Sequence, residues 1–162
     1  MSIKLGNRIP ASAVETLHSG NLKRARAVIF MISTDPQNFP HIALLSPFQV
    51  IIEDSSTLYF SVYKNSSTHD YLVKNQKFTL ILQDAPALLY LKCQIIQTEI
   101  EHKQHDETHH FFKAEPIEIL RDVSEKTPLT SEMLFDTDQI ATDYMHEFLE
   151  LSQFIRKLRN EK

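Results

Sequence analysis

Hydrophobic residues recur at helical spacing over a long stretch only near the end of the chain. Six apolar positions follow one another there at intervals of 4, 4, 3, 4 and 3 residues: Ile140, Tyr144, Phe148, Leu151, Ile155 and Leu158. This spacing places them on one face of a helix of about 20 residues, roughly 30 Å long. The pattern predicts a long amphipathic C-terminal helix over about 138–160, with cationic side chains in its last turn.

The remaining apolar sequence is divided into shorter runs that are typical of strands. In the third of these runs, Leu58, Phe60 and Val62 alternate with residues that face the other side. Pro47 interrupts the second run and indicates an edge or a bulge, and Pro116 indicates an irregularity in the last run. Six strands are predicted in all, over 25–33, 41–52, 57–63, 78–82, 87–100 and 111–122.

Two short helices with capping signals interrupt the strands. Ser12 and Glu15 have the spacing of a capping box, and Gly20 suits the position just after that helix. Ser67 is a candidate cap for a second helix, and Asn75 can close it in a left-handed conformation.

The order of these elements favours a mainly β (α+β) fold. Strands at hairpin-like spacing are typical of an antiparallel sheet or a small barrel. A chain of 162 residues has the usual length of one domain. We therefore predict a single domain over 1–162, with a six-stranded antiparallel barrel at about 20–122, flanking helices and the long C-terminal helix.

Charge and hydropathy exclude two classes of partner. Seventeen Lys and Arg against 21 Asp and Glu give a net charge of −4, whereas general nucleic-acid binding needs a basic surface. The longest apolar run, Ala27–Ile32, is far shorter than the roughly 20 residues of a transmembrane helix. No apolar signal segment is visible at the N-terminus. We expect no nucleic acid, no membrane and a cytoplasmic location.

Glycine and cysteine usage excludes several kinds of site. Gly6 and Gly20 are the only glycines, so neither dinucleotide-binding nor P-loop motifs can be present, and a G-x-S-x-G hydrolase motif is excluded too. Cys93 is the only cysteine, which excludes an internal disulfide and any multi-cysteine zinc site. It lies in an apolar strand segment and is predicted to be a buried, unreactive thiol.

The start of the second helix has the composition of a phosphate site. A helix N-terminus presents unpaired backbone N–H groups and a positive dipole end. Ser66, Ser67 and Thr68 add hydroxyl groups there, and Lys64 and His69 add positive charge nearby. The alternative interpretation is that Ser67 only caps the helix.

Three stretches, in this order, resemble the FMN-binding split barrels of the pyridoxamine 5′-phosphate oxidase-like superfamily. Phe39–Phe48 resembles the family's second strand, of "Pro-His-x-Ser-Pro" type. Leu58–Ser61, followed by Ser66–Leu72 and Asn75, resembles the next strand and the "S-x-T-x-x-N-L" turn with its helix. Leu91–Ile96 resembles the long fifth strand. The resemblance covers roughly residues 10–122.

The resemblance implies a homodimer that binds FMN non-covalently between its protomers and acts as an oxidoreductase on a small molecule. In the family the flavin ring lies against the second and third strands. Carried over by position, Ser46, Phe48 and Ser61 would lie near the ring or its phosphate. The turn at Lys64 and Ser66–His69 would hold the phosphate. For Ser46 and Pro47, a plain edge-strand bulge is the competing interpretation.

Two departures separate this chain from pyridoxamine 5′-phosphate oxidase itself. Those enzymes carry an Arg-Lys pair after the serine of the turn, where Thr68 and His69 stand here. They also end in a segment with Trp and Arg that closes on the substrate, and this chain contains no Trp. The substrate is therefore expected to differ, and we predict no catalytic residue.

A histidine cluster supports a different hypothesis. His102, His105, His109 and His110 stand in a polar stretch that is predicted to be a loop, in which His105 and His109 have helical metal-pair spacing. No general base accompanies them, so a solvated loop is expected and no metal site is predicted. A haem-binding split barrel with a histidine ligand is one alternative function. A cofactor-free dimeric interaction module is the other.

Overall fold

The fold is described here from a computed structural model. It describes residues 2–21, 27–84, 86–98, 109–127 and 129–135, together with 149, 151–153 and 155.

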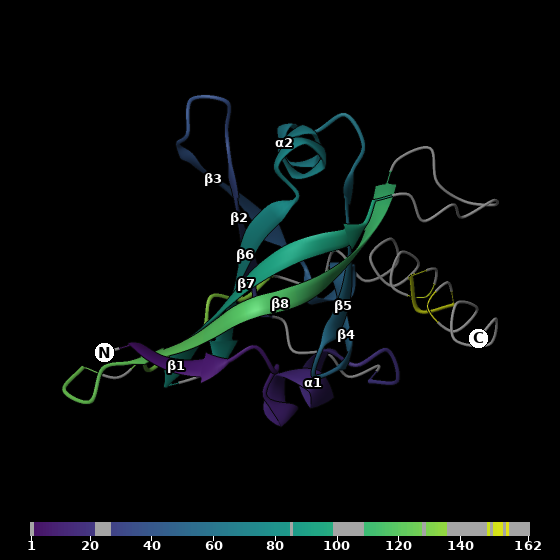
Figure 1. Cartoon of the computed structure of the whole chain (residues 1–162). Helices are drawn as coiled ribbons and strands as arrows, with labels where there is room; N and C mark the ends of the chain where they lie inside the picture. Colours follow the sequence, from purple (N-terminus) through teal and green to yellow (C-terminus); the bar gives the residue numbers. More distant parts are fainter. Residues whose placement is uncertain are drawn as a thin grey trace.

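Eight strands form one antiparallel sheet in this described part of the chain. Along the sheet the order is β3-β2-β6-β7-β8-β5-β4, and β1 pairs with β8 outside this path. The sheet curls into a half-barrel whose edge strands, β3 and β4, follow one another in the chain (Figure 1). The strands are β1 (Ser2–Gly6), β2 (Ile29–Thr34), β3 (Pro40–Leu45), β4 (Val50–Asp54), β5 (Thr57–Tyr63), β6 (Lys77–Asp84), β7 (Ala87–Gln97) and β8 (His109–Val123).

The long strand β8 connects the two halves of the sheet. One of its edges pairs with β7 from Lys113 to Val123. Its other edge pairs first with β5, through His109–Ala114, and then with β1, through Ile119–Asp122. The first residues of β8 therefore lie beside the end of β5, where the chain turns into the second helix.

Two helices lie at opposite ends of the curled sheet (Figure 1). Helix α1 (Ala11–Leu17) packs on β4, and helix α2 (Ser67–Asn75) packs on β2 and β5. Asn75 fastens α2 to the sheet, because its side-chain amide donates to the Thr34 carbonyl at 2.7 Å. Helix α2 thus covers the end of the barrel where β2 ends and β6 begins.

The inner face of the sheet encloses the main core. Phe60 and Phe112 are fully buried and stack with their ring centroids 5.1 Å apart, and Phe78 meets Phe60 edge-on at 4.8 Å. These three rings come from β5, β8 and β6, so they hold the two halves of the sheet together. Burial of such side chains contributes about 1.5–3 kcal/mol each.

A second, smaller core lies on the outer face of β4, β5 and β8. It contains Ile51, Tyr59, Phe111, Leu151 and Ile155, with Phe48 packed against it. Leu149, Leu151–Gln153 and Ile155 are helical, but most of the helix predicted over about 138–160 lies outside the described residues, so its length stays a prediction. The two buried apolar residues of that segment, Leu151 and Ile155, are four residues apart, as the predicted apolar face requires.

The prediction of six strands is wrong in two places. The segment predicted as one strand over 41–52 is divided into β3 and β4 by a 3₁₀ turn, Pro47–Gln49. Proline has no N–H to donate to a sheet ladder, so the chain leaves the sheet there and returns at its other edge. β1 has no counterpart in the prediction, because it is short, exposed and carries only two large apolar residues, Ile3 and Leu5.

The helix ends also differ from the predictions. In α1, Ser12 is inside the helix, Pro10 takes the cap position without a side-chain bond, and the helix ends at Leu17 rather than near Gly20. In α2, Gln76 and not Asn75 adopts the left-handed conformation, with φ 54°. The Asn75 side chain is engaged with β2 instead.

Two sequence interpretations are confirmed. The pairing of β7 with β8 shifts register beside Pro116, as the predicted irregularity requires. Cys93 is buried, and burial raises the pKa of its thiol. Such a thiol is unreactive. None of the helices among the described residues has the length and apolar character needed to cross a membrane.

Glu118 on β8 joins three neighbouring strands and gives a prediction for acid stability. Its carboxylate lies 2.7 Å from Nζ of Lys4 and 2.5 Å from Nζ of Lys92. Hydrogen bonds from the two ammonium groups lower the pKa of Glu118 to about 2. A lowered carboxyl pKa stabilises the fold above the unfolded-state value, and this stability is lost as pH falls through the folded-state value.

We therefore expect Glu118→Gln to be less stable than the unchanged protein near neutral pH. The difference should shrink between about pH 4.5 and pH 2, as the carboxyl group becomes protonated in both states. Urea unfolding at a series of pH values measures it. A stability difference that stayed constant down to pH 2 would contradict the assignment.

Candidate functional site

The turn between β5 and α2 is built by its own sequence. Asn65 adopts φ 62°, a conformation that asparagine tolerates well, and the N–H of Ser66 donates to the Tyr63 carbonyl at 3.3 Å. The Ser66 hydroxyl donates to the same carbonyl at 2.7 Å and accepts from the N–H of His69 at 3.1 Å. Ser66 is therefore the N-cap of α2, one residue before the predicted cap, Ser67.

The hydroxyl of Ser67 is the one in this turn that remains available to a ligand. The side chain of Ser67 is exposed, whereas the side-chain hydrogen bonds of the turn are made by Ser66. The N–H groups of Ser67 and Thr68 belong to the first turn of α2, which has no intrahelical acceptors for them. Three donors thus remain at the positive end of the helix dipole, which favours an anionic group.

His41 on β3 closes one side of this turn. Its Nε2 lies 3.0 Å from Oγ1 of Thr68, one of the two buried residues of α2. The His41 ring also meets the ring of Tyr71 edge-on at 5.1 Å. Sequence reasoning placed His41 only in a strand motif, and its pairing with Thr68 depends on β3 passing beside α2.

His69 and His110 close the other side. Nε2 of His69 lies 3.0 Å from Nδ1 of His110, and Nδ1 of His69 lies 3.1 Å from Oδ1 of Asp70. Nε2 of His110 is hydrogen-bonded to the Thr98 carbonyl. The prediction that His110 belongs to a loop is wrong, because His109 and His110 begin β8 and pair with β5.

The His110 ring is held by the aromatic core. It stacks on Phe112 with centroids 4.5 Å apart and an interplanar angle of 17°. Phe112 in turn stacks on Phe60. His109, on the opposite face of β8, packs on Tyr63 at 4.3 Å. The histidines at the start of β8 thus divide between the two faces of the strand.

The remaining predicted site residues do not gather at the turn. Ser46 is buried and caps the 3₁₀ turn: its Oγ accepts from the Phe48 N–H at 3.2 Å, and its own N–H donates to the Gln49 side chain. Phe48 packs against the outer core. Ser61 is buried on the face of β5 that carries Tyr59. The structure therefore brings together Lys64 and Ser66–His69, and places Ser46, Phe48 and Ser61 elsewhere along β3–β5.

The edge strand β3 leads from the turn toward Ser46 and exposes apolar side chains. Ile42 and Leu44 are more than half exposed, and Phe39, just before the strand, is 67% exposed. Alternate residues His41 and Ala43 face inward. An exposed apolar row on an unpaired strand edge is an uncommon surface for a monomer.

Solved structures match this fold, although no family model matches the chain and no curated protein matches its sequence. A protein from Lactobacillus delbrueckii assigned to the pyridoxamine 5′-phosphate oxidases superposes with a TM-score of 0.55 at 14% identity, over 72% of this chain and 97% of that one. An F420 reductase superposes with a TM-score of 0.51 at 9% identity, over 68% and 98%.

The chain has the split-barrel fold of these proteins. The resemblance of its ordered motifs is therefore confirmed for the fold. At these identities the likeness carries no information about which residues of the split barrel bind a ligand.

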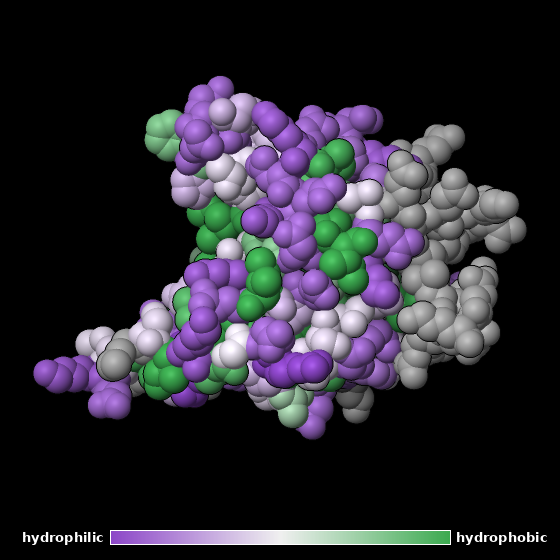
Figure 2. Space-filling view, in the orientation of Figure 1, coloured by the Kyte–Doolittle hydropathy of each residue, from purple (hydrophilic) through white to green (hydrophobic). Residues whose placement is uncertain are grey.

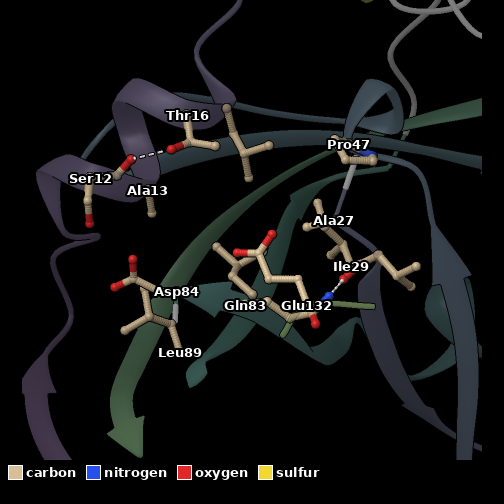
Figure 3. Close-up of a pocket in the computed structure, with 13 residues that line it drawn as sticks. Ser12, Ala13, Thr16, Ala27, Ile29, Pro47, Gln83, Asp84, Leu89 and Glu132 are labelled. Atoms are coloured by element: carbon tan, nitrogen blue, oxygen red, sulfur yellow. Dashed lines mark hydrogen bonds between the residues drawn. The ribbon is translucent and has the colours of Figure 1, made fainter. Parts of the chain in front are cut away.

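The split barrel also contains a cavity at the end opposite α2. It measures about 260 Å³ and lies between α1, the ends of β6 and β7 and the segment 27–29 (Figure 3). Leu17, Leu82 and Leu89 are among its apolar lining, and the carboxylates of Asp84 and Glu132 reach into it. The cavity does not include the turn at Ser66–His69.

Gln83, which lines this cavity, binds Met133 in the segment 129–134. Its Nε2 donates to the Val28 carbonyl at 2.8 Å and to the Met133 carbonyl at 3.1 Å, and its Oε1 accepts from the Met133 N–H at 2.7 Å. One side-chain amide thus contacts both backbone groups of Met133, whose carbonyl also accepts from the Val28 N–H at 2.9 Å.

Gln83→Leu should loosen this segment, which keeps the bond from the Val28 N–H to the Met133 carbonyl. The Met133 amide loses its acceptor, and we expect its hydrogen exchange to accelerate by about fivefold, since a hydrogen bond contributes about 1 kcal/mol. Gln83→Glu is the matched control, because it keeps the acceptor and loses only the donors. Unchanged exchange in Gln83→Leu would show that Gln83 does not hold the segment.

The described residues contain no group of three or more His, Cys, Asp or Glu side chains arranged to hold a metal ion. His102 and His105 lie outside them. His109 is in a strand and not in the helix that its predicted pairing with His105 requires. The ring nitrogens of His110 are both engaged, so a metal or haem iron would have to displace a hydrogen bond there.

Proposed function

We propose that this split barrel binds FMN non-covalently, with the phosphate at the N-terminus of α2, and acts as a small flavin-dependent oxidoreductase. The single observation that carries the proposal is the turn itself. It combines two helix N–H groups without intrahelical acceptors, an exposed Ser67 hydroxyl and the positive charge of Lys64. These are the donor types that a phosphate monoester needs.

The fit of this turn to a phosphate differs from a plain helix cap. A cap needs one side chain, and Ser66 already supplies it. The Ser67 hydroxyl has no structural role among the described residues. The imidazoles of His41 and His69 lie on the two sides of the turn. His41 contacts the Thr68 hydroxyl, and His69 follows Ser67 by two positions in α2 and contacts His110.

The edge strand β3 supports the placement of the isoalloxazine ring. It starts beside the turn at His41 and rises about 3.3 Å per residue toward Ser46. Its exposed Ile42 and Leu44 offer an apolar surface along that path. Figure 2 shows hydrophobic surface at the indentation near β3, and further hydrophobic clusters over the middle of the same face.

A second copy of the chain is the proposed cover for that surface. The unpaired edge of β3 and its apolar side chains suit a homodimer with a cofactor site at the interface. The structurally similar F420 reductase and Lactobacillus protein carry names that indicate a flavin-type cofactor, which is consistent with this choice of cofactor.

Bound FMN would supply hydride acceptance and donation. The chain's own residues do the positioning: the turn at Ser67 and Thr68 holds the phosphate, and β3 with a partner excludes water from the ring. Such chemistry needs no protein acid or base, and we assign none. The substrate is a small molecule, and the missing Arg-Lys pair argues against a vitamin B6 phosphate.

The test is a visible absorption spectrum of the purified full-length protein, before and after addition of FMN, followed by gel filtration. We expect a two-band yellow spectrum that stays with a dimeric protein. Coenzyme F420 and haemin are added to separate samples for comparison. No retention of FMN would overturn the proposal. A Soret band with haemin would then favour a haem-binding protein, and no colour with any of them would favour an interaction module.

A further inference from the structure

Four groups form a continuous chain of hydrogen bonds at the start of α2. Asp70 Oδ1 contacts Nδ1 of His69 at 3.1 Å, and Nε2 of His69 contacts Nδ1 of His110 at 3.0 Å. Nε2 of His110 then bonds the Thr98 carbonyl. The chain links α2 with β8 and with the end of β7, so the orientation of His69 is set from three elements.

The number of protons in this chain follows from its acceptors. A carbonyl oxygen only accepts, so Nε2 of His110 carries a proton. An exposed aspartate carboxylate also only accepts, so Nδ1 of His69 carries a second. One further proton must lie between the two rings. Three contacts therefore require three protons, whereas two neutral imidazoles carry only two.

We propose that His69 and His110 share one extra proton, and that its charge strengthens the α2 turn as a phosphate site. His110 is the positioning residue: it accepts the proton of His69 through Nδ1 and is itself oriented by Phe112 and Thr98. This inference rests on the proposed function. It makes FMN binding pH-dependent, with the grip strongest when the shared proton is bound and weaker as pH rises.

The other charged groups at the turn do not produce this dependence. Lys64 stands in the turn, Asp70 on α2, His41 on β3 and His109 on β8. Lysine and aspartate side chains in general keep their charge between about pH 5.5 and 8.5. His109 packs on Tyr63 on the other face of β8. Among the described residues, His41 is the remaining imidazole at the turn, and it needs its own control.

The first experiment reads the proton directly, without FMN. Imidazole ¹⁵N chemical shifts of the full chain are followed from pH 5 to 9. We expect His69 and His110 to titrate together as a coupled pair. In Asp70→Asn the side-chain amide can donate to Nδ1 of His69, so two neutral rings satisfy every contact and the titration should move to lower pH. Independent titration, unchanged in Asp70→Asn, would overturn the shared proton.

The second experiment measures FMN affinity over the same pH range in the unchanged protein, His110→Phe, Asp70→Asn and the control His41→Gln. His110→Phe preserves the stacking on Phe112. Because FMN's own phosphate titration is common to all, the differences between proteins report the site. We expect the FMN affinity of the unchanged protein to fall by about tenfold from pH 6 to 8.5. This fall in affinity should be smaller in His110→Phe and Asp70→Asn and should be retained in His41→Gln. Riboflavin, which lacks the phosphate, should bind with little pH dependence.

The two possible failures are distinguishable. If FMN binds at no pH, the proposed function fails, and the pH-dependent grip fails with it, while the NMR titration still decides the shared proton. If FMN binds with the same pH profile in all four proteins, the proposed function stands and the role of His110 is overturned.

Discussion

Ser67→Asp is expected to abolish FMN binding while leaving the fold intact. The new carboxylate would stand at the first position of α2, beside the two open N–H groups, where the proposed phosphate lies. Two charges of like sign about 4 Å apart near a protein surface repel by several kcal/mol, which corresponds to a loss of affinity of more than about a hundredfold. Fluorescence titration with FMN measures this loss.

The fold should tolerate this change because an acidic residue in the first turn of a helix interacts favourably with the dipole. The melting temperature is therefore expected to stay the same or rise slightly. Ser67→Ala is the matched control: it removes one exposed hydroxyl and should weaken binding by only about fivefold. Unchanged affinity in Ser67→Asp would place the phosphate elsewhere.

Phe60→Ala is expected to cause the largest loss of stability. Phe60 is fully buried and touches both Phe112 and Phe78, so its removal leaves a cavity between β5, β6 and β8. Large-to-small changes at such positions cost about 3–5 kcal/mol, a large share of the total stability of a small domain. Urea unfolding followed by circular dichroism gives the value.

Phe60→Leu serves as the control, since it keeps an apolar side chain in the same space and should cost about 1–2 kcal/mol. A loss below about 1 kcal/mol in Phe60→Ala would mean that the inner core can collapse around the site. Phe112 stacks on Phe60 on one side and on His110 on the other. Phe60→Ala should therefore also alter the imidazole chemical shifts of His110.

Local patterns determined much of the fold. The alternation at Leu58, Phe60 and Val62 identified a strand with one face in the core, because side chains on a strand alternate with period two. The Ser/Thr-rich start of α2 identified a helix N-terminus, with the cap displaced by one residue to Ser66. Both signals lie within a few residues of the feature they predict.

The places where the prediction failed depend on contacts between distant segments. β1 is exposed and owes its strand conformation to pairing with β8, more than a hundred residues later. Asn75 was expected to end α2 through its backbone, but its side chain binds Thr34, and Gln76 takes the left-handed position instead. In both cases the partner is absent from the local sequence.

The candidate site shows the same division. The sequence by itself determined that a turn with open hydroxyl and N–H donors precedes a helix at Ser66–His69, because capping and helix dipoles are local properties. Only the tertiary structure decided that His41 reaches Thr68 and that His110 reaches His69. These pairs join residues 27 and 41 positions apart, and they form because the curled sheet brings β3 and the start of β8 to the two sides of α2.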